Sequence, residues 1–574
     1  MVNLTINNKA VSVPEGTTIL DAAKSVGINI PTLCFLKEIN EIGACRVCLV
    51  EIEGVERLAA SCVTIAEEGM VVKTNSPRVR AARKTNLELI LSEHNCHCTS
   101  CPRSGNCALQ DFANNQIVKE DVYEKNFEEK KWDDSFALIR DNTKCIKCMR
   151  CISFCDKVQT LGVWDMLGSG AKTTVNVRDG KNIRDVDCSL CGQCITHCPV
   201  GALHERSDTD RAFEAIADEN KVVVVQIAPA VRGAWGESLG LAREDATIEK
   251  MTAAIRAMGV DYVFDTDFAA DLTIMEEGSE FIERLTHRDQ YSFPMFTSCC
   301  PGWIRFIKTQ YPDMLANLST AKSPHQMFGA LLKGYFAQKL DIAPERLYVI
   351  SIMPCVAKKS ECDIPVMQDE NGIRDVDLVL TTRELDRMIK AESIDVASLE
   401  DSAFDSPFAA ATGAGVIFGA TGGVMEAALR SAYFLVTGKN PDADAFQNVR
   451  GMDGWKEATV EINGIKVRAA VASGLGNARK LIDAVRAGEV EYDFVEIMAC
   501  PGGCSGGGGQ PIAFNEELAE DRAANLYFLD KTANLRFSHE NPDVIKLYED
   551  FLEKPNSHVS HKYLHTEYES WTVK

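Results

Sequence analysis

The sequence predicts a multidomain protein of mixed α+β and α/β class, and three observations point to it. The chain has 574 residues, which suggests several cores rather than one. Sixteen of its 22 cysteines lie in clusters before residue 200. After about residue 210, short apolar, β-branched runs alternate with helical or glycine-rich segments, as in buried parallel strands. We therefore expect small cysteine-rich domains followed by one α/β domain.

Composition limits the classes of function. The net charge of -22 argues against nucleic acid and anionic membranes as partners, although solubility alone explains it equally well. The N-terminus, "MVNLTINNKAVSV", lacks a signal-peptide pattern, and no segment approaches the roughly 18 apolar residues of a membrane span. We expect a cytoplasmic protein, in which so many cysteines indicate metal ligation rather than disulfides.

Residues 1–77 form the first expected domain. Alternating apolar residues on both sides of Asn7-Asn8 predict a β-hairpin, and Thr17 or Thr18 can cap the helix "ILDAAKSV". A C-x10-C-x2-C-x13-C array follows, made of Cys34, Cys45, Cys48 and Cys62. Four thiolates suit a [2Fe-2S] cluster, and zinc is the alternative. The module resembles a plant-type ferredoxin, with a longer first spacing that is more similar to the ferredoxin-like domain of respiratory complex I.

Residues 78–118 form the second expected domain. Ser76 and Pro77 begin the predicted helix "SPRVRAARKTNLELILSEH", which ends at an H-x3-C-x2-C-x5-C pattern. Its members are His94, Cys98, Cys101 and Cys107. The pattern resembles the His-ligated [4Fe-4S] site of the same families. His97 and Cys96 are rival ligands, but the spacing favours His94, and Cys96 would crowd Cys98.

Residues 135–208 carry the most specific pattern, two copies of C-x2-C-x2-C-x3-C in "CIKCMRCISFC" and "CSLCGQCITHCP". This is the arrangement of bacterial ferredoxins with two [4Fe-4S] clusters, in which the fourth cysteine of each run ligates the other cluster. One predicted set is Cys145, Cys148, Cys151 and Cys198, and the other is Cys188, Cys191, Cys194 and Cys155. Successive clusters predict an electron-transfer chain.

Residues 209–555 form the expected α/β domain, with a C-terminal tail over 556–574. The runs "KVVVVQIAP", "RLYVISIMPC" and "YDFVEIMACPGGC" predict strands, and ligands of such sheets collect at their carboxyl ends. Cysteines fall there or close by: Cys300, Cys355, Cys500 and Cys504. We expect one metal site built from three segments, with buried structural cysteines as the alternative. Cys299 adjoins Cys300 and should point the other way.

The segments "FTSCCPGW", "MPCVAKKSECD" and "ACPGGCSGGGGQP" are similar to the three signature motifs of the di-iron (FeFe) hydrogenases. The order of all modules resembles the larger clostridial and NAD(P)-linked members over essentially the whole chain. The resemblance implies reversible reduction of protons to dihydrogen at an H-cluster, a [4Fe-4S] cube joined to a di-iron subcluster with carbon monoxide, cyanide and azadithiolate ligands. It also implies one [2Fe-2S] cluster and three accessory [4Fe-4S] clusters.

The resemblance assigns roles residue by residue. Cys300, Cys355, Cys500 and Cys504 would hold the cube, and the Cys504 sulfur would bridge to the subcluster. Lys358 would pair with a cyanide, and the expected pocket walls are Met353, Pro354, Pro324 and Phe418. His325 and Ala230 stand where the family often has Gln and Ser, and we expect these departures to tune function without abolishing it.

The resemblance also implies a proton relay. A thiol with a pKa near ~8.5 can exchange a proton near neutral pH, and Cys299 would do so. The relay would continue through Glu277, Ser319 and Glu280 to Arg284 at the surface. Without the resemblance, Glu277 and Glu280, three apart on a helix, predict a solvated face equally well.

Several functions and partners remain open. One alternative is a non-enzymatic iron-sulfur assembly factor, and another is an electron-transfer subunit of the complex I type. As a hydrogenase, the chain is expected to serve an electron-bifurcating complex that couples hydrogen to ferredoxin and NAD(P), with a stand-alone ferredoxin-dependent enzyme as the alternative. No Rossmann glycine fingerprint is visible, so flavin and NAD(P) would bind other iron-sulfur subunits.

Two further features of the sequence are less specific. A run without acidic residues predicts a basic patch for an acidic ferredoxin: Lys73, Arg78, Arg80, Arg83 and Lys84. Cys96 and Cys362 have no role that the pattern assigns.

Overall fold

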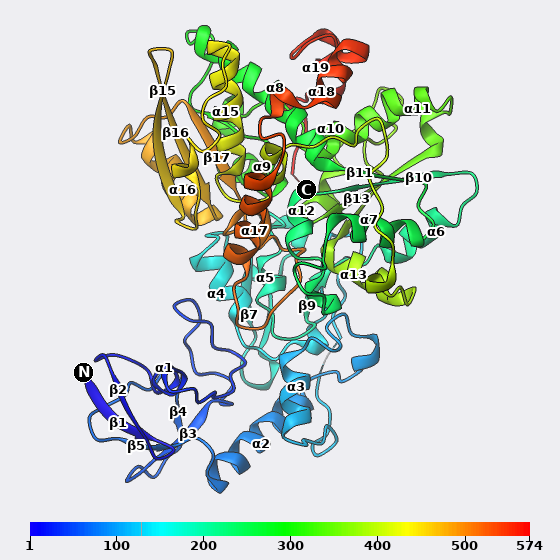
Figure 1. The fold of residues 1–574 in the computed structure, drawn as a ribbon. Coiled ribbons are helices and arrows are strands. Elements are labelled where there is room, and N and C mark those ends of the chain that lie inside the picture. Colours follow the sequence, from blue (N-terminus) through cyan, green and yellow to red (C-terminus); the bar gives the residue numbers. More distant parts are fainter. Residues whose placement is uncertain (128, 574) are drawn as a thin grey trace.

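The computed structural model describes residues 1–127 and 129–573. The N-terminal strands lie at one end of the molecule, the segments around α4 (Arg150–Lys157) and β9 (Leu203–Glu205) in the middle, and the two sheets of the α/β part at the other end (Figure 1). Residue 574, the last of the expected tail, lies outside the described residues. Within the described part, no helix is both long and apolar enough to cross a membrane.

The N-terminal part is a small five-stranded sheet with one helix. The strands have the order β2-β1-β5-β3-β4. As predicted, β1 and β2 form a hairpin, and its turn holds Asn7 and Asn8 at φ 48° and 67°, the left-handed region that such tight turns require. Thr18 caps the helix, since its hydroxyl accepts from the Asp21 amide at 3.1 Å. The elements are β1 Val2–Ile6, β2 Lys9–Val13, α1 Ile19–Ser25, β3 Leu49–Ile52, β4 Ala59–Ala60 and β5 Val71–Lys73.

The middle part begins with the predicted helix, capped by Ser76 with Pro77 in its first turn. The two ferredoxin-type runs have matching backbones, because Lys147 and Met149 in the first and Leu190 and Gly192 in the second all have positive φ. The elements are α2 Pro77–Ser92, α3 Ala108–Asn115, β6 Leu138–Arg140, α4 Arg150–Lys157, β7 Trp164–Leu167, β8 Thr174–Val177, α5 Gln193–Thr196 and β9 Leu203–Glu205.

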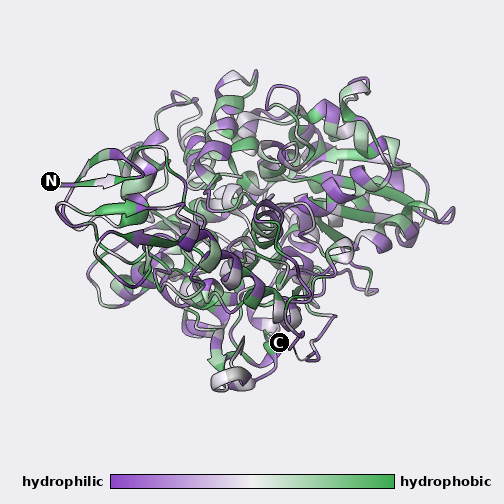
Figure 2. Cartoon of the chain, turned by 90° about the horizontal axis from the view of Figure 1, so that it is seen from below, coloured by the Kyte–Doolittle hydropathy of each residue, from purple (hydrophilic) through white to green (hydrophobic). Residues whose placement is uncertain are grey.

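The α/β part contains two four-stranded sheets, so the three predicted strands do not share one sheet. The first sheet is parallel with the order β11-β10-β13-β14, and the second has the order β12-β17-β16-β15 with an antiparallel β15–β16 pair. The strands are β10 Val222–Ile227, β11 Tyr262–Asp265, β12 Met295–Phe296, β13 Leu347–Met353, β14 Leu378–Thr381, β15 Trp455–Ile462, β16 Ile465–Ser473 and β17 Phe494–Met498. These strands are largely hydrophobic, whereas the surrounding helices carry both hydrophobic and hydrophilic residues (Figure 2).

Helix α8 (Thr266–Thr286) lies between the cores of the two sheets. Phe268 and Leu272 pack into the core around β10 and β13, whereas Ile274 and Phe281 pack into the core around β16 and β17. Because both cores cover this helix, most of its carboxylates are removed from solvent: Asp267, Asp271, Glu276, Glu277 and Glu280 are buried, and Glu283 is exposed. The other helices of this part are α6 Thr209–Ile216, α7 Ile248–Ala257, α9 Pro301–Gln310, α10 Pro324–Leu331, α11 Ala337–Lys339, α12 Ala357–Glu361, α13 Thr382–Ala391, α14 Gly413–Ile417, α15 Gly423–Thr437, α16 Leu475–Arg486, α17 Ala519–Thr532, α18 Pro542–Leu547 and α19 His558–Leu564.

Candidate metal centres and active site

The first cysteine array folds into two thiol pairs. The sulfurs of Cys48 and Cys62 lie 3.3 Å apart, and Cys34 hydrogen-bonds with Cys45. These bonds lower the pKa of Cys45 to about 6 and that of Cys48 to about 7. Two pairs fit a two-iron cluster in which each iron takes two thiolates, and favour it over zinc, which would draw four sulfurs to one point. Across the described residues, no group of three or more His, Cys, Asp or Glu side chains is placed to hold a single metal ion.

In the second array, the His94 side chain has the surroundings expected of a metal ligand. The side chain is buried, and Nδ1 lies 2.9 Å from the Lys144 carbonyl oxygen. Since a carbonyl only accepts, Nδ1 carries the proton and Nε2 keeps a lone pair for a metal. The two alternative ligands have different surroundings. His97 is exposed, and the Cys96 sulfur accepts from the Lys125 ammonium at 3.1 Å.

The fourth cysteine of each ferredoxin-type run lies near cysteines of the other run, the placement that the exchanged-ligand pattern requires. Burial raises the pKa of Cys148, and the nearby thiol of Cys198, from the other run, adds to the effect. Burial likewise raises the pKa of Cys155 to about 12, and its thiol neighbours are Cys191 and Cys188. Each set of four therefore contains one cysteine of the other run.

Direct contacts connect the metal sites in a branched order. The first array meets the Cys148 segment through Asn40, and the second meets the same site through Arg103, whose Nη1 donates to the Cys198 carbonyl at 3.2 Å. The second ferredoxin-type site then reaches the α/β part, where the Cys500 sulfur lies 3.5 Å from the Cys191 carbonyl oxygen. The first and second arrays thus both contact the segments of the Cys145 set, an arrangement that linear spacing does not reveal.

Four cysteines meet at an enclosed cavity between the two sheets. Cys300 follows β12 and precedes α9, Cys355 follows β13, and Cys500 and Cys504 follow β17. The space between the cavity's lining atoms, counted together with its opening to solvent, is about 730 Å³, and the lining is almost entirely apolar. Every predicted pocket residue lines it: Ala230, Cys299, Pro324, His325, Met353, Pro354, Lys358 and Phe418. Residues that the sequence reading missed line it too: Thr266, Ala270, Gly419, Met498, Gly503 and Gly507.

A buried polar chain holds Lys358 and His325. Glu361 accepts from the Lys358 ammonium at 3.2 Å and from His325 Nε2 at 2.5 Å. Burial and the Lys358 charge lower the pKa of His325 to about 4, although Glu361 acts in the opposite direction. The neutral ring therefore donates from Nε2 and accepts from the Ser351 hydroxyl at Nδ1, 3.2 Å away. Neither Glu361 nor Ser351 was predicted; the i,i+3 spacing of Lys358 and Glu361 was the available signal.

The predicted relay residues gather on α8 and the segment after α9. Ser319 donates to Glu280 at 2.8 Å, and Arg284 Nη2 donates to Glu280 at 2.6 Å. Glu277 is buried, and burial followed by the Glu280 charge raises its pKa to about 8. Burial and the charge of Glu277 also raise the pKa of Cys299. Among the described residues the Glu277 oxygens make no hydrogen bond of normal geometry, but the Ser319 hydroxyl and the Ser298 amide approach the carboxyl closely enough to oppose the rise in its pKa.

Three sequence expectations about exposure are wrong. Arg284 is only 4% exposed and does not reach the surface, because its guanidinium donates to Glu280 and to the Leu318 carbonyl. The solvated-face alternative for Glu277 and Glu280 fails for the same burial. Arg83 is also buried, since it donates to the carbonyls of Val47, Leu49 and Thr74. The basic patch therefore consists of Lys73, Arg78, Arg80 and Lys84, which are exposed.

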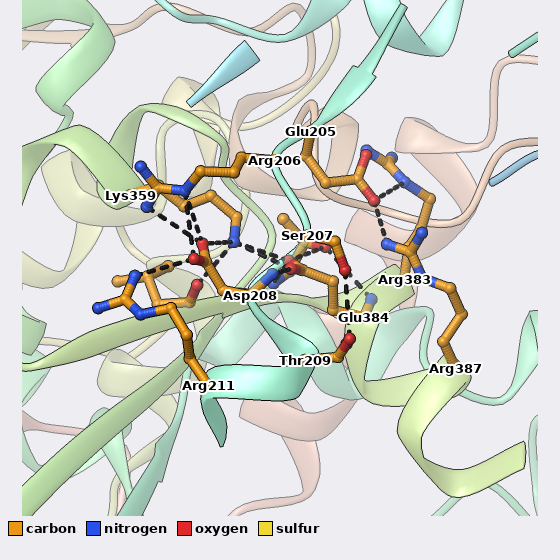
Figure 3. Close-up of polar contacts among 12 residues, drawn as sticks. Glu205, Arg206, Ser207, Asp208, Thr209, Arg211, Lys359, Arg383, Glu384 and Arg387 are labelled. Carbon is orange, nitrogen blue, oxygen red and sulfur yellow. Dashed lines mark hydrogen bonds and ion pairs between the residues drawn. The ribbon is translucent and has the colours of Figure 1, made fainter. Parts of the chain in front are cut away.

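Ion pairs join the accessory part to the active-site segments (Figure 3). Lys359, next to Lys358 on α12, lies 2.7 Å from Asp208 and 3.0 Å from Glu384. Arg383 donates to Glu205 at 2.6 Å and to the carbonyl of Gly508, in the loop after Cys504, at 2.8 Å. The same acidic segment after β9 thus anchors α12 and the loop of Cys504.

Cys96 and Cys362 are the two cysteines to which the sequence assigned no role, and each has a hydrogen-bond partner. Cys362 is buried in the core of the first sheet, where its sulfur accepts from Gln326 at 3.6 Å. All 22 cysteines lie in the described part of the chain, and all are free thiols.

The two ferredoxin-type runs, the enclosed four-cysteine cavity and the contact between Cys191 and Cys500 define an iron-sulfur oxidoreductase with a buried active site. Sequence families match in the same order along the chain. "2Fe-2S iron-sulfur cluster binding domain" matches residues 1–77, "NADH-ubiquinone oxidoreductase-G iron-sulfur binding region" 83–121, and "NADH-quinone oxidoreductase subunit 3, ferredoxin-like domain" 137–204. "Iron only hydrogenase large subunit, C-terminal domain" matches 221–508 and "Iron hydrogenase small subunit" 516–571.

The chain belongs to the FeFe hydrogenase family and is an iron-sulfur oxidoreductase acting on hydrogen. It is 50% identical to the NADP-reducing hydrogenase subunit HndD of Solidesulfovibrio fructosivorans, over 99% of each chain. It is 40% identical to iron hydrogenase 1 of Clostridium pasteurianum, over 99% of this chain and all of that one. A variant of the apo FeFe hydrogenase HydA1 of Chlamydomonas reinhardtii superposes with a TM-score of 0.58 at 43% identity, over 64% of this chain and 99% of that chain.

A relative of the assembly-factor class also matches, at lower identity and over less of the chain. A cytosolic Fe-S cluster assembly factor of Xenopus tropicalis is 32% identical over 67% of this chain and 83% of its own. The full-length matches are hydrogenases, so the recognised family, the predicted fold class and the enzyme class are confirmed.

Proposed function

We propose that Cys300, Cys355, Cys500 and Cys504 hold the cube of an H-cluster and that the cavity beside them holds its di-iron part. The observation that carries this proposal is the cavity itself, which brings four thiols and one buried ammonium together in an apolar enclosure. When bound, the H-cluster supplies the redox chemistry that joins two protons and two electrons. The protein excludes water, and Lys358, kept charged by Glu361, offers a cation to an anionic ligand.

We propose that Cys299, Glu277, Ser319 and Glu280 move protons to this site. Glu277 supports the proposal, because a carboxyl with a pKa of about 8 can both hold and release a proton near neutral pH. Glu280 is the outermost acid of the group, with a side chain that is 11% exposed, whereas Arg284 fixes its position from within.

We propose one [2Fe-2S] cluster at the Cys34 array and three accessory [4Fe-4S] clusters. These are held by the His94 set, the Cys145 set and the Cys188 set. The paired thiols of the first array and the exchanged fourth cysteines of the ferredoxin-type runs support this count. The Cys34 set and the His94 set both contact the segments of the Cys145 set. This arrangement would let two electron donors or acceptors exchange electrons with one active site.

We propose that the chain is the hydrogen-activating subunit of a cytoplasmic, electron-bifurcating complex that couples hydrogen to ferredoxin and NAD(P). Its 50% identity, over nearly the whole length, to a protein named NADP-reducing hydrogenase subunit supports this assignment. Flavin and NAD(P) would then bind other iron-sulfur subunits. The stand-alone ferredoxin-dependent alternative rests on the 40% identity to iron hydrogenase 1 and on the exposed basic residues, Lys73 and Arg80 among them.

Anaerobic purification from the native host, with identification of co-purifying chains, separates the two assignments. The complex predicts co-purifying flavin- and NAD(P)-binding chains and hydrogen-dependent NAD(P) reduction. Isolation of the single chain with full activity on ferredoxin would contradict the complex and leave the hydrogenase assignment intact.

A further inference from the structure

The buried side chain of Asn40 lies between two segments that carry cysteine ligands. Its Nδ2 donates to the Cys34 carbonyl at 2.7 Å and to the Cys148 carbonyl at 2.9 Å. The Ser153 hydroxyl donates to Oδ1 at 2.7 Å, which fixes the orientation of the amide. Asn40 is 0% exposed, and its backbone is bonded to Leu36 in both directions. A single nitrogen atom thus joins two residues that are expected to hold different clusters.

This contact gives a short bonded route between the two sites, because one nitrogen atom spans both carbonyls. Electrons tunnel more readily through covalent and hydrogen bonds than across gaps, so two good hydrogen bonds to one nitrogen form an effective link. Arg150 offers a parallel route, in which Nε donates to the Cys34 carbonyl at 3.4 Å and Nη1 to the His197 carbonyl at 3.3 Å. That route has longer bonds and crosses three guanidinium atoms.

We propose that the Asn40 side chain is the electron bridge between the site of Cys34 and the site of Cys148. The proposal rests on the function proposed above, in which these sites hold a [2Fe-2S] and a [4Fe-4S] cluster. The step moves one electron from the reduced site to the oxidised one, breaks no bond and transfers no proton. Asn40 is a positioning residue, because it holds the two ligand segments in electronic contact and does not itself react.

The test follows the electron in time. After anaerobic mixing with hydrogen, rapid freeze-quenching and electron paramagnetic resonance report when each cluster becomes reduced. In Asn40→Ala we expect the [2Fe-2S] signal to appear about tenfold later, the change that ~1.4 kcal/mol of activation free energy produces, with unchanged timing of the [4Fe-4S] signals. Asn40→Asp should also delay it, because a carboxylate cannot donate to either carbonyl.

Lys157→Met is the matched control. Lys157 is exposed and donates to the Ile39 carbonyl at 2.6 Å, so its loss loosens the same loop without touching a cysteine carbonyl. We expect wild-type timing in this variant. Equal delay in Lys157→Met and Asn40→Ala would mean that Asn40 only docks the loop, and wild-type timing in Asn40→Ala would refute the bridge outright.

Ser153→Ala covers the case in which Asn40→Ala loses its [2Fe-2S] signal. It keeps both cysteine loops and frees the amide to rotate, so a smaller delay is expected and wild-type timing contradicts the bridge. A wrong cofactor assignment gives a different result from a wrong bridge. In that case the wild-type protein would show no [2Fe-2S] signal, or no reduction by hydrogen at all.

Discussion

Replacing Glu277 by glutamine tests the proton relay at a buried carboxyl with a strongly raised pKa. The carboxyl is 1% exposed, and burial followed by the Glu280 charge raises its pKa from 4.5 to about 8. At pH 7 it is therefore protonated and can still release that proton. Glutamine keeps the shape but cannot, so turnover should fall by about 10²–10⁴-fold, the usual contribution of a positioned acid-base group.

The same shift predicts a stability change with a defined sign. Between pH 4.5 and about 8 the folded protein holds a proton on Glu277 that the unfolded chain releases, so wild-type stability falls as pH rises through this window. At about 1.4 kcal/mol per pH unit, the full cost is roughly 5 kcal/mol above pH 8. Glu277→Gln avoids this cost and should match wild type at pH 4.5 and be more stable at pH 9.

Two assays check these outcomes. Hydrogen evolution from reduced methyl viologen measures turnover, and thermal unfolding at pH 4.5 and pH 9 measures the stability difference. Near-normal turnover in Glu277→Gln would refute the relay. A stability difference that is the same at both pH values would refute the raised pKa.

Three further predictions concern other groups. Cys299→Ala should keep its clusters but lose at least about 10²-fold in turnover, whereas Cys300→Ala should lose the cube. Hydrogen evolution measures the turnover, and iron content measures the clusters. Near-normal turnover in Cys299→Ala would contradict its relay role. His94→Cys should lower the reduction potential of its site, because a charged thiolate replaces a neutral imidazole, and an unchanged potential in a redox titration would exclude His94 as ligand. Lys359→Met should cost about 3–5 kcal/mol of stability, because it leaves the buried Glu384 carboxylate without its cation, whereas Asp208 keeps its pairs with Arg206 and Arg211. Lys546→Met removes an exposed pair and should change thermal unfolding little, so equal effects of the two variants would argue against the buried network.

Cysteine spacing was enough to predict which thiols lie near one another in the fold; that these thiols are cluster ligands stays a prediction. The thiols of the first array pair as two irons require, and the fourth cysteines of the ferredoxin-type runs lie with the opposite sets. The cavity beside Lys358 also gathers the wall residues that the family resemblance implied; Met353 and Pro354 adjoin Cys355 in its motif, whereas Ala230, Pro324, His325 and Phe418 come from other segments.

Burial and partners across the chain could not be read from spacing. Helical periodicity places Glu277 and Glu280 on one face, but only the packing of two separate cores on α8 shows that this face is covered. Arg284 and Arg83 resemble surface cations in sequence, and each is buried by donating to backbone carbonyls. Asn40 carries no motif at all, because its role depends on a carbonyl 108 positions away.

The central claim is that this chain builds an H-cluster at Cys300, Cys355, Cys500 and Cys504. Infrared spectroscopy of the anaerobically purified protein, beside Cys504→Ser, tests it most directly. We expect carbon monoxide and cyanide bands in the wild type and their loss in Cys504→Ser, together with loss of hydrogen turnover. A wild type that contains its clusters but shows no such bands, or a Cys504→Ser variant that keeps them, would contradict the account.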